Sequence, residues 1–283
     1  MEPRPSAVLS AARAEGIRTG VRRRFFAATM CDAMFVRPTN PVSHRLARMA
    51  FIMACVAALI VASAGPLHRF IGLEIEPAFT IFRYGFYFAV AGAALGLATV
   101  VPTRPGDRRR GFLAALLALM IGVAAAYMPL NWFLRAQQGP ELNDITTDTN
   151  SPPPLVVTLQ LRRGASNPAT YPGAHAAVLQ RAAYPDIAPV VLPDPPAEAF
   201  RKVDAVAMAM GWDVVARAPA EGRIEAIATS AWFGFQDDIV IRIRPDGAGS
   251  KVDIRSKSRD GESDLGVNAK RIREFVAKLK APS

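Results

Sequence analysis

The sequence predicts an α+β protein in which three transmembrane helices precede a small soluble α-β-β-β-β-α domain with an antiparallel sheet. Two observations lead to this prediction. Three apolar stretches without a charged residue fill much of the first half of the chain. Residues 194–283 then show helical and strand-like hydrophobic periods, separated by glycine at the turns.

The apolar stretches are Met49–Leu67, Tyr84–Thr103 and Gly111–Leu134, within a transmembrane region of residues 48–135. At a rise of about 1.5 Å per residue, each stretch can cross a hydrocarbon core about 30 Å thick as a helix. A cleaved signal peptide is the alternative for the first stretch, but 48 residues before it make a leader far longer than usual. No stretch contains an ionisable Asp, Glu, Lys, Arg or His, which argues against a transporter or a pump.

Charge is distributed unevenly between the two halves of the chain. Residues 1–135 contain 16 Lys and Arg against 6 Asp and Glu, whereas residues 136–283 contain 18 of each. The net charge of +10 therefore belongs to the membrane half, which argues against a nucleic-acid-binding domain. Nine arginines precede the first stretch and four lie in the 104–110 loop. The positive-inside rule then places the N-terminus in the cytoplasm of a bacterial inner-membrane protein and the C-terminal domain in the periplasm.

Cysteine and histidine offer little chemistry to the exported part. Residues 1–47 form a basic tail that we expect to be disordered and cytoplasmic. Cys31 lies in this tail and Cys55 in the first apolar stretch, so the soluble part has no disulfide and no thiol nucleophile. His175 is its only histidine. We therefore predict no metal site and no cofactor, and we assign no catalytic residue.

Residues 136–193 form a proline-rich segment, in which the density of proline excludes long regular elements. We expect this segment to wrap the domain or to link it to the membrane. Its first part has side chains that suit Asx-type turns. It forms a secondary candidate patch, made of Asn143, Asp144, Thr146, Thr147 and Asp148.

The soluble α+β domain is expected over residues 194–283. Asp194 followed by two prolines predicts a helix start, and Gly211 predicts its end. Four alternating runs predict strands, and a last amphipathic helix is expected from about Asp264. The strand runs are Trp212–Arg217, Arg223–Thr229, Asp238–Arg244 and Ser250–Ser256.

The main candidate site joins the last strand to the last helix. Alternation predicts Arg255, Lys257 and Arg259 on one strand face, with Ser256 and Ser258 on the other. Arginines beside hydroxyls at a helix N-terminus suit the binding of a carboxylate or phosphate. An internal network of Arg and Asp that fixes the strand-to-helix crossing is the alternative. The candidate residues are Arg255, Ser256, Ser258, Arg259, Asp264, Asn268 and Arg271.

These residues also resemble a known family. The run Arg255 to Arg259, then Gly261, Ser263 to Gly266 and Asn268 to Ile272, is similar to the signature of the bacterial family called domain of unknown function 1499. Further similar patches are Asn143 to Asp148, Tyr184 to Ile187, Gly211 with Trp212, and Asp237 with Asp238. The resemblance covers roughly residues 140–280. It implies an exported or membrane-tethered envelope module and brings no established activity.

Two classes of function remain open from the sequence. The first, which we favour, is a non-enzymatic envelope module that binds another membrane or periplasmic protein, a lipid headgroup or an envelope polymer. The second is a membrane-anchored enzyme acting on an anionic or ester substrate. In it, Asp264 or Asp148 would be acid or base, and Arg255, Arg259 and Arg271 would stabilise charge. The sequence shows no clear pair of nucleophile and base, which argues against the enzyme. Whichever class holds, the lipid bilayer is a partner and nucleic acid is not.

Overall fold

The structure is a computed structural model and describes residues 41–103 and 110–281. The basic tail expected over residues 1–47 therefore lies outside the described residues up to residue 40, and residues 41–47 begin a helix. The chain divides into two compact units. One unit comprises Met1–Ala57 and Phe88–Val123, as far as these are described, and the other comprises Ala58–Tyr87 and Ala124–Ser283.

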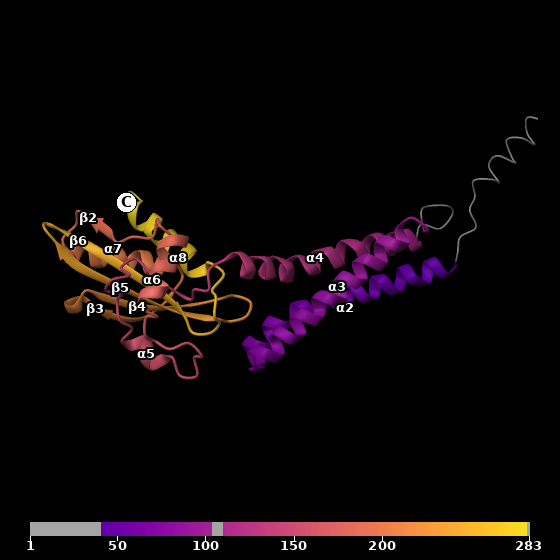
Figure 1. The fold of residues 1–283 in the computed structure, drawn as a ribbon, viewed down its shortest axis with the longest axis horizontal. Coiled ribbons are helices and arrows are strands. Elements are labelled where there is room, and N and C mark those ends of the chain that lie inside the picture. The colour runs from indigo at the N-terminus through magenta and orange to yellow at the C-terminus, as the bar shows by residue number, and fades with distance from the viewer. Residues whose placement is uncertain (1–40, 104–109, 282–283) are drawn as a thin grey trace, which may run out of the picture. The chain divides into compact units, whose positions relative to one another are not determined.

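Three long apolar helices make up the N-terminal part of the described chain. They are α2 (Pro41–Ile71), α3 (Ile75–Val100) and α4 (Arg110–Gln138), labelled in Figure 1. Each contains a segment long and apolar enough to cross a membrane: Val42–Ile71, Ile75–Val100 and Gly111–Gln137. Pro66 lies in the interior of α2 and Pro129 in the interior of α4.

Small residues bring the helices of the first unit close together. A Cβ atom added to Gly92 of α3 would lie 3.1 Å from the backbone nitrogen of Ala54 in α2. A Cβ added to Gly122 of α4 would lie 2.7 Å from the carbonyl oxygen of Ala89 in α3. The helix backbones are therefore so close that a side chain larger than glycine would not fit at these positions without a shift. Small residues permit such close packing of helices inside membranes.

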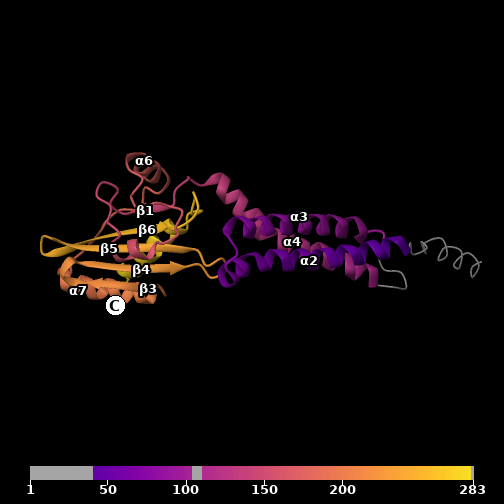
Figure 2. The ribbon, with the colours of Figure 1, turned by 90° about the horizontal axis from the view of Figure 1, so that it is seen from below.

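The α+β domain follows these helices, and its sheet is antiparallel throughout. Its strands lie in the order β1-β6-β5-β4-β3 (Figure 2). Strand β2 also pairs with β6. The strands are β1 (Asp144–Thr146), β2 (Val190–Leu192), β3 (Asp213–Ala218), β4 (Arg223–Thr229), β5 (Gln236–Asp246) and β6 (Gly249–Ser258). The helices are α5 (Val157–Leu161), α6 (Ala174–Ala183), α7 (Pro196–Ala209) and α8 (Val267–Lys280), with a 3-10 turn η1 (Pro219–Glu221).

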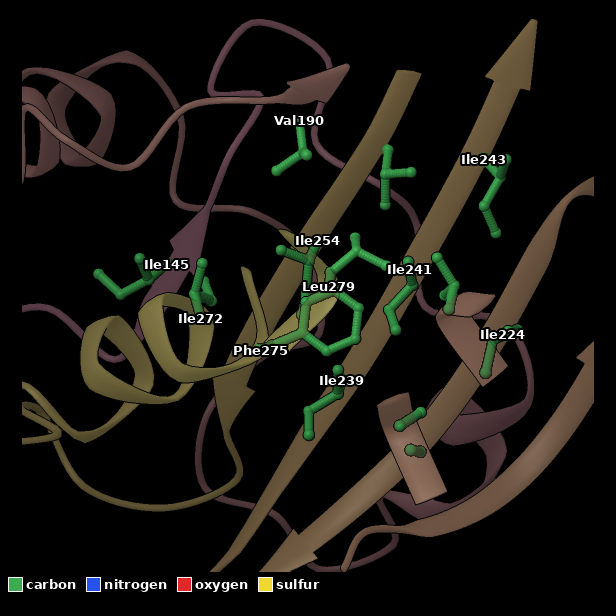
Figure 3. Packing of buried hydrophobic residues seen from close by; sticks show 14 of the residues in the cluster. Ile145, Val190, Ile224, Ile239, Ile241, Ile243, Ile254, Ile272, Phe275 and Leu279 are labelled. Atoms are coloured by element: carbon green, nitrogen blue, oxygen red, sulfur yellow. The ribbon is translucent and has the colours of Figure 1, made fainter. Parts of the chain in front are cut away.

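One face of the sheet forms the apolar core. Ile239, Ile241 and Ile243 alternate along β5 and point to this face. Figure 3 shows Ile239 and Ile241 beside Phe275 of α8. Helix α7 contributes its buried residues to the same cluster, including Val203. The two helices therefore cover this face, and the predicted α-β-β-β-β-α domain with its antiparallel sheet is confirmed.

Two features of the domain differ from the expected pattern. Strands β1 and β2 are additional, and each is only three residues long, too short to show an alternating pattern. Helix α8 begins at Val267 rather than near Asp264. Leu265 and Gly266 have left-handed backbones, with φ of 54° and 80°, and this geometry cannot continue a right-handed helix.

Gly222 provides a test of how closely the backbone packs at a left-handed glycine. It has φ of 61°, and an added Cβ would collide with the carbonyl oxygen of Ile243. Gly164 has φ of 84° with nothing within 4 Å of its added Cβ, so it is the matched control. We expect Gly164→Ala to cost about 1–2 kcal/mol of stability for the left-handed backbone alone. Gly222→Ala should cost about 1–3 kcal/mol more because of the collision.

The measurement is urea unfolding of the full-length protein in detergent micelles, with resistance to protease as the signal for the folded state. Equal losses for the two alanine variants would contradict the steric part of this expectation.

Candidate functional site

The second face of the sheet carries charged residues on four neighbouring strands. The register pairs Lys257 of β6 with Asp144 of β1 on one side and with Asp238 of β5 on the other. Directly paired residues of antiparallel strands point to the same face. Arg255 shares this face, because it lies two residues from Lys257 on β6.

Asp144 is the centre of the first ion cluster. Its two carboxylate oxygens accept hydrogen bonds from Arg255, from Nε to Oδ1 at 2.8 Å and from Nη2 to Oδ2 at 2.7 Å. The Lys257 ammonium donates to Oδ2 at 3.0 Å. Asp144 and Lys257 are each 1% exposed and Arg255 is 3% exposed. Burial lowers the pKa of Lys257, an effect that the neighbouring carboxylate of Asp144 opposes.

The proline-rich segment closes over this cluster. Arg255 donates its remaining hydrogen bonds to the carbonyl oxygens of Pro153, at 3.1 Å, and of Ala169, at 2.9 Å. Its guanidinium also lies 5.7 Å from the centre of the Tyr171 ring. Backbone carbonyls of the segment thus accept hydrogen bonds from the buried guanidinium of Arg255, and these bonds hold the segment against the sheet.

Asp238 is the centre of a second cluster on the same face. Arg162, just after α5, donates to its Oδ2 at 2.5 Å, and Arg259 donates Nη2 to its Oδ1 at 2.8 Å. Arg259 also donates to the side-chain oxygen of Gln236. Asp238 is completely buried, so two guanidinium groups share one carboxylate away from water.

Glu225 on β4 holds the start of α5. Its carboxylate accepts the backbone N–H groups of Val156, Val157 and Thr158 at 2.9–3.1 Å, and the Thr158 hydroxyl at 2.7 Å. Burial acts to raise the pKa of Glu225, but these hydrogen bonds outweigh it and lower the pKa. The carboxylate therefore caps the helix from the sheet, which is favourable at a helix N-terminus.

The serine side of β6 faces α8. Ser256 donates to Asn268 Oδ1 at 2.7 Å, and Asn268 Nδ2 donates to Ser258 Oγ at 3.0 Å. Arg271 donates to Ser256 Oγ at 2.9 Å and to Asp237 Oδ2 at 2.6 Å. The candidate residues Ser256, Ser258, Asn268 and Arg271 thus form one network that joins the strand to the helix.

Asp264 holds the backbone just before α8. Its Oδ1 accepts from Gly266 N and its Oδ2 from Asn268 N, both at 2.8 Å. Burial raises the pKa of Asp264 above the usual range of an aspartate. Its hydrogen bonds fix the left-handed turn and the first turn of the helix together.

The secondary patch of residues 143–148 is continuous with the main cluster through Asp144. Asn143 donates to Gly261 O at 2.9 Å, and the Thr147 hydroxyl accepts Ile254 N at 2.9 Å. The backbone of Thr146 exchanges two hydrogen bonds with the buried amide of Gln180. Asp148 accepts the backbone N–H groups of Asn150 and Ser151, which is an Asx-type turn.

Asp148 also takes part in a third ion cluster. Its Oδ2 accepts from Arg242 at 3.1 Å and from Arg244 at 3.4 Å. The same two arginines donate to Asp253 Oδ2, each at 2.8 Å. Asp253 is fully buried, and within the described residues its Oδ1 has no hydrogen-bond partner. This cluster fixes the start of the proline-rich segment against β5 and β6.

Sequence reasoning missed the partners of these groups, above all Asp238, Glu225 and Arg162. A signal for one of them existed: Asp238 and Arg242 lie on the same face of β5, opposite its isoleucines. Arg162 and the Glu225 cap gave no local signal. In chemical terms the arrangement is a buried scaffold of paired charges, and among residues 41–103 and 110–281 no group of His, Cys, Asp and Glu suits a metal ion.

Tyr171 is the second buried polar group that, among the described residues, has an unpartnered side-chain atom, its Oη. Burial raises its pKa to about 12, and the charge of Asp144 adds to this effect. The pKa of Tyr171 in the folded protein lies above the ordinary value of 10. The free energy of unfolding therefore keeps its full contribution from the neutral phenol below pH 10, and this contribution is lost as the pH rises through about 12. We expect Tyr171→Phe to remove this alkaline loss and to leave stability at pH 7 unchanged or higher.

Urea unfolding of both full-length proteins at neutral and alkaline pH measures the difference. A Phe variant that loses as much stability as the wild type at alkaline pH would contradict it. Tyr184, whose pKa is also raised by burial, is present in both proteins, so its contribution cancels.

Comparison with known proteins gives one family. Residues 144–279 match a family model described as protein of unknown function (DUF1499). No curated protein matches the chain at a significant level. The match includes the three ion clusters and α8 up to Leu279.

Proposed function

The α+β domain of this chain belongs to the DUF1499 family, and from that premise we propose a non-enzymatic binding module anchored in a bacterial inner membrane. The three apolar helices are the anchor. The α+β domain lies in the periplasm, and its partner is another protein of the membrane or the envelope.

Charge supports the proposed orientation. Arginines are concentrated before the first apolar stretch and in the loop between α3 and α4, whereas residues 68–83, between the first two apolar stretches, contain Glu74 and Glu76 beside Arg69 and Arg83. Loops rich in Lys and Arg remain in the cytoplasm, so α4 leads the chain to the opposite side. Alkaline phosphatase fused after Ser283 should therefore be active. A cytoplasmic reporter that is active in the same position would contradict the orientation.

The observation that carries the binding role is the way the buried charges hold α5. Glu225 binds the first turn of this helix and Arg162 ties its end to Asp238. The helix nevertheless exposes apolar side chains to solvent: Leu159 is 51% exposed and Leu161 is 46% exposed. An apolar surface that is held in a fixed conformation suits docking of a protein partner, because little conformational entropy is lost on binding.

The pairing of the candidate arginines argues for a protein rather than an anionic lipid or polymer. Arg255, Arg259 and Arg271 each form an ion pair inside the domain. An anionic ligand at this cluster would have to compete for a guanidinium group with a carboxylate that already accepts its hydrogen bonds. Membrane anchoring raises the local concentration of the partner, so a weak contact through α5 suffices.

Site-specific photo-crosslinking in native membranes tests this role. A photoreactive residue at Gln160, exposed on α5, should give one discrete protein adduct, and Leu159→Ser with Leu161→Ser should reduce it at least tenfold. The matched control is the same residue at Met208, exposed on α7. Equal adducts at both positions, or an adduct that the serine variant leaves unchanged, would count against binding through α5.

A membrane-anchored enzyme acting on an anionic or ester substrate is the second candidate. Perturbed pKa values often mark catalytic groups, and burial lowers the pKa of Lys257 and raises that of Asp264. The test is release of acid from extracted envelope lipids by the full-length protein, followed by mass spectrometry. Release that Lys257→Met abolishes would favour the enzyme over the binding module.

A further inference from the structure

The turn between β4 and β5 carries three aromatic residues, and we call residues 230–235 the aromatic tip. Within the second unit, the tip packs against the ends of the apolar helices. Phe233 is 1% exposed, and its ring centre lies 5.4 Å from that of Phe79 in α3 and 5.6 Å from that of Trp132 in α4. The tip is therefore buried among side chains that belong to membrane-spanning helices.

Trp232 makes the most specific contact of the tip. Its indole Nε1 donates a hydrogen bond to the carbonyl oxygen of Ala62 in α2, at 3.2 Å. In a regular helix this carbonyl would accept the N–H of residue 66, but residue 66 is a proline and has no N–H. The indole thus donates to the carbonyl that Pro66 leaves without a helical partner.

Gly65 provides the space for this contact. A Cβ atom at this position would lie 2.8 Å from the carbonyl oxygen of Trp232 and 2.9 Å from two carbons of its indole ring. The next turn of α2 adds a further contact, because Arg69 donates hydrogen bonds to the carbonyl oxygens of Ser230 and Ala231. Gly65 therefore supplies the space, and the adjacent Pro66 leaves the carbonyl oxygen of Ala62 to accept the indole N–H.

We propose that the aromatic tip is a docking element that fixes the α+β domain to the first membrane helix, with the Gly65–Pro66 step of α2 as its receptor. Ala62 lies inside the apolar span Val42–Ile71. A carbonyl without a partner costs several kcal/mol in hydrocarbon, so a donor from the tip is worth more there than in water. Tryptophan is also favoured at the membrane interface.

Docking at this position connects the membrane helices with the buried charges. Gln236 and Asp238 follow the tip directly on β5, and both bind Arg259. The tip and the ion cluster that holds α5 are therefore neighbours along β5. The inference requires that the helices lie in a membrane, but not that α5 binds a partner.

Fluorescence of the full-length protein in phosphatidylcholine vesicles tests the position of the tip. Trp132→Phe with Trp212→Phe leaves Trp232 as the only tryptophan, and brominated acyl chains should quench its emission while aqueous iodide should not. The control keeps only Trp212, which stacks on Phe275 in the core of the domain. Quenching of Trp232 by brominated lipid that is no stronger than that of Trp212 would overturn the proposal.

A double-mutant cycle tests the hydrogen bond itself. Trp232→Phe should speed amide hydrogen exchange of the tip about tenfold, as expected for the loss of one hydrogen bond. In a Pro66→Ala protein the new N–H occupies Ala62 O, so the same substitution should have an effect of less than about threefold. The same tenfold effect in both backgrounds would overturn the assigned pair. Failure of crosslinking at Gln160 would leave this result unaffected, so the two proposals fail separately.

Discussion

Asp238→Asn should lower the free energy of unfolding by about 3–5 kcal/mol, because it leaves the guanidinium groups of Arg162 and Arg259 buried without a counter-charge. Asn keeps the shape of the side chain, so the loss reports on charge rather than on packing. The loss of free energy is measured by urea unfolding of the full-length protein in micelles, with protease resistance as the signal for the folded state.

The matched control is Asp186→Asn. Asp186 also pairs with an arginine, Arg273, but its side chain is 52% exposed, and exposed ion pairs contribute only about 0–1 kcal/mol. A loss at Asp238 as small as that at Asp186 would show that the buried cluster is hydrated in solution. Such hydration would reopen the reading of Arg259 as an anion-binding residue.

Asp144→Asn should also cost about 3–5 kcal/mol, because Arg255 and Lys257 then share one buried site without a carboxylate. Lys257→Met should be close to neutral, since the Met fills the same space without burying a charge. We therefore expect coupling between the two positions. In a Lys257→Met protein only Arg255 is left unpaired, and Asp144→Asn should cost clearly less.

The double-mutant cycle of the two positions measures this coupling in the same unfolding assay. Strictly additive losses would contradict a direct interaction between Lys257 and Asp144. A large loss on Lys257→Met alone would show instead that the ammonium stabilises the folded state.

The faces and the order of the elements could be predicted because local patterns determine them. Alternation along β5 separates Ile239 from Asp238, and hydropathy alone identifies the three apolar helices. The pairs within the site could not be predicted in this way. Asp144 and Arg255 are 111 positions apart, and a period of two fixes the face of each side chain but not its partner.

The contact between the aromatic tip and α2 also could not be predicted from local sequence patterns. Glycine between the alternating runs predicts turns, and Gly234 lies in the observed hairpin between β4 and β5. Nothing near Trp232 indicates that its partner is Ala62, because the two residues are 170 positions apart. The prolines of the 136–193 segment indicate extended chain, but not the sheet face that this chain covers.

The long separation between Asp144 and Arg255 also affects how the protein is made. Synthesis adds roughly 5–20 residues per second, so the carboxylate precedes its partner by about 5–20 s. During that interval the proline-rich segment has no strand β6 to cover. The domain therefore cannot acquire its native tertiary structure while the chain is growing, and it must remain unaggregated until the last strand has been synthesised.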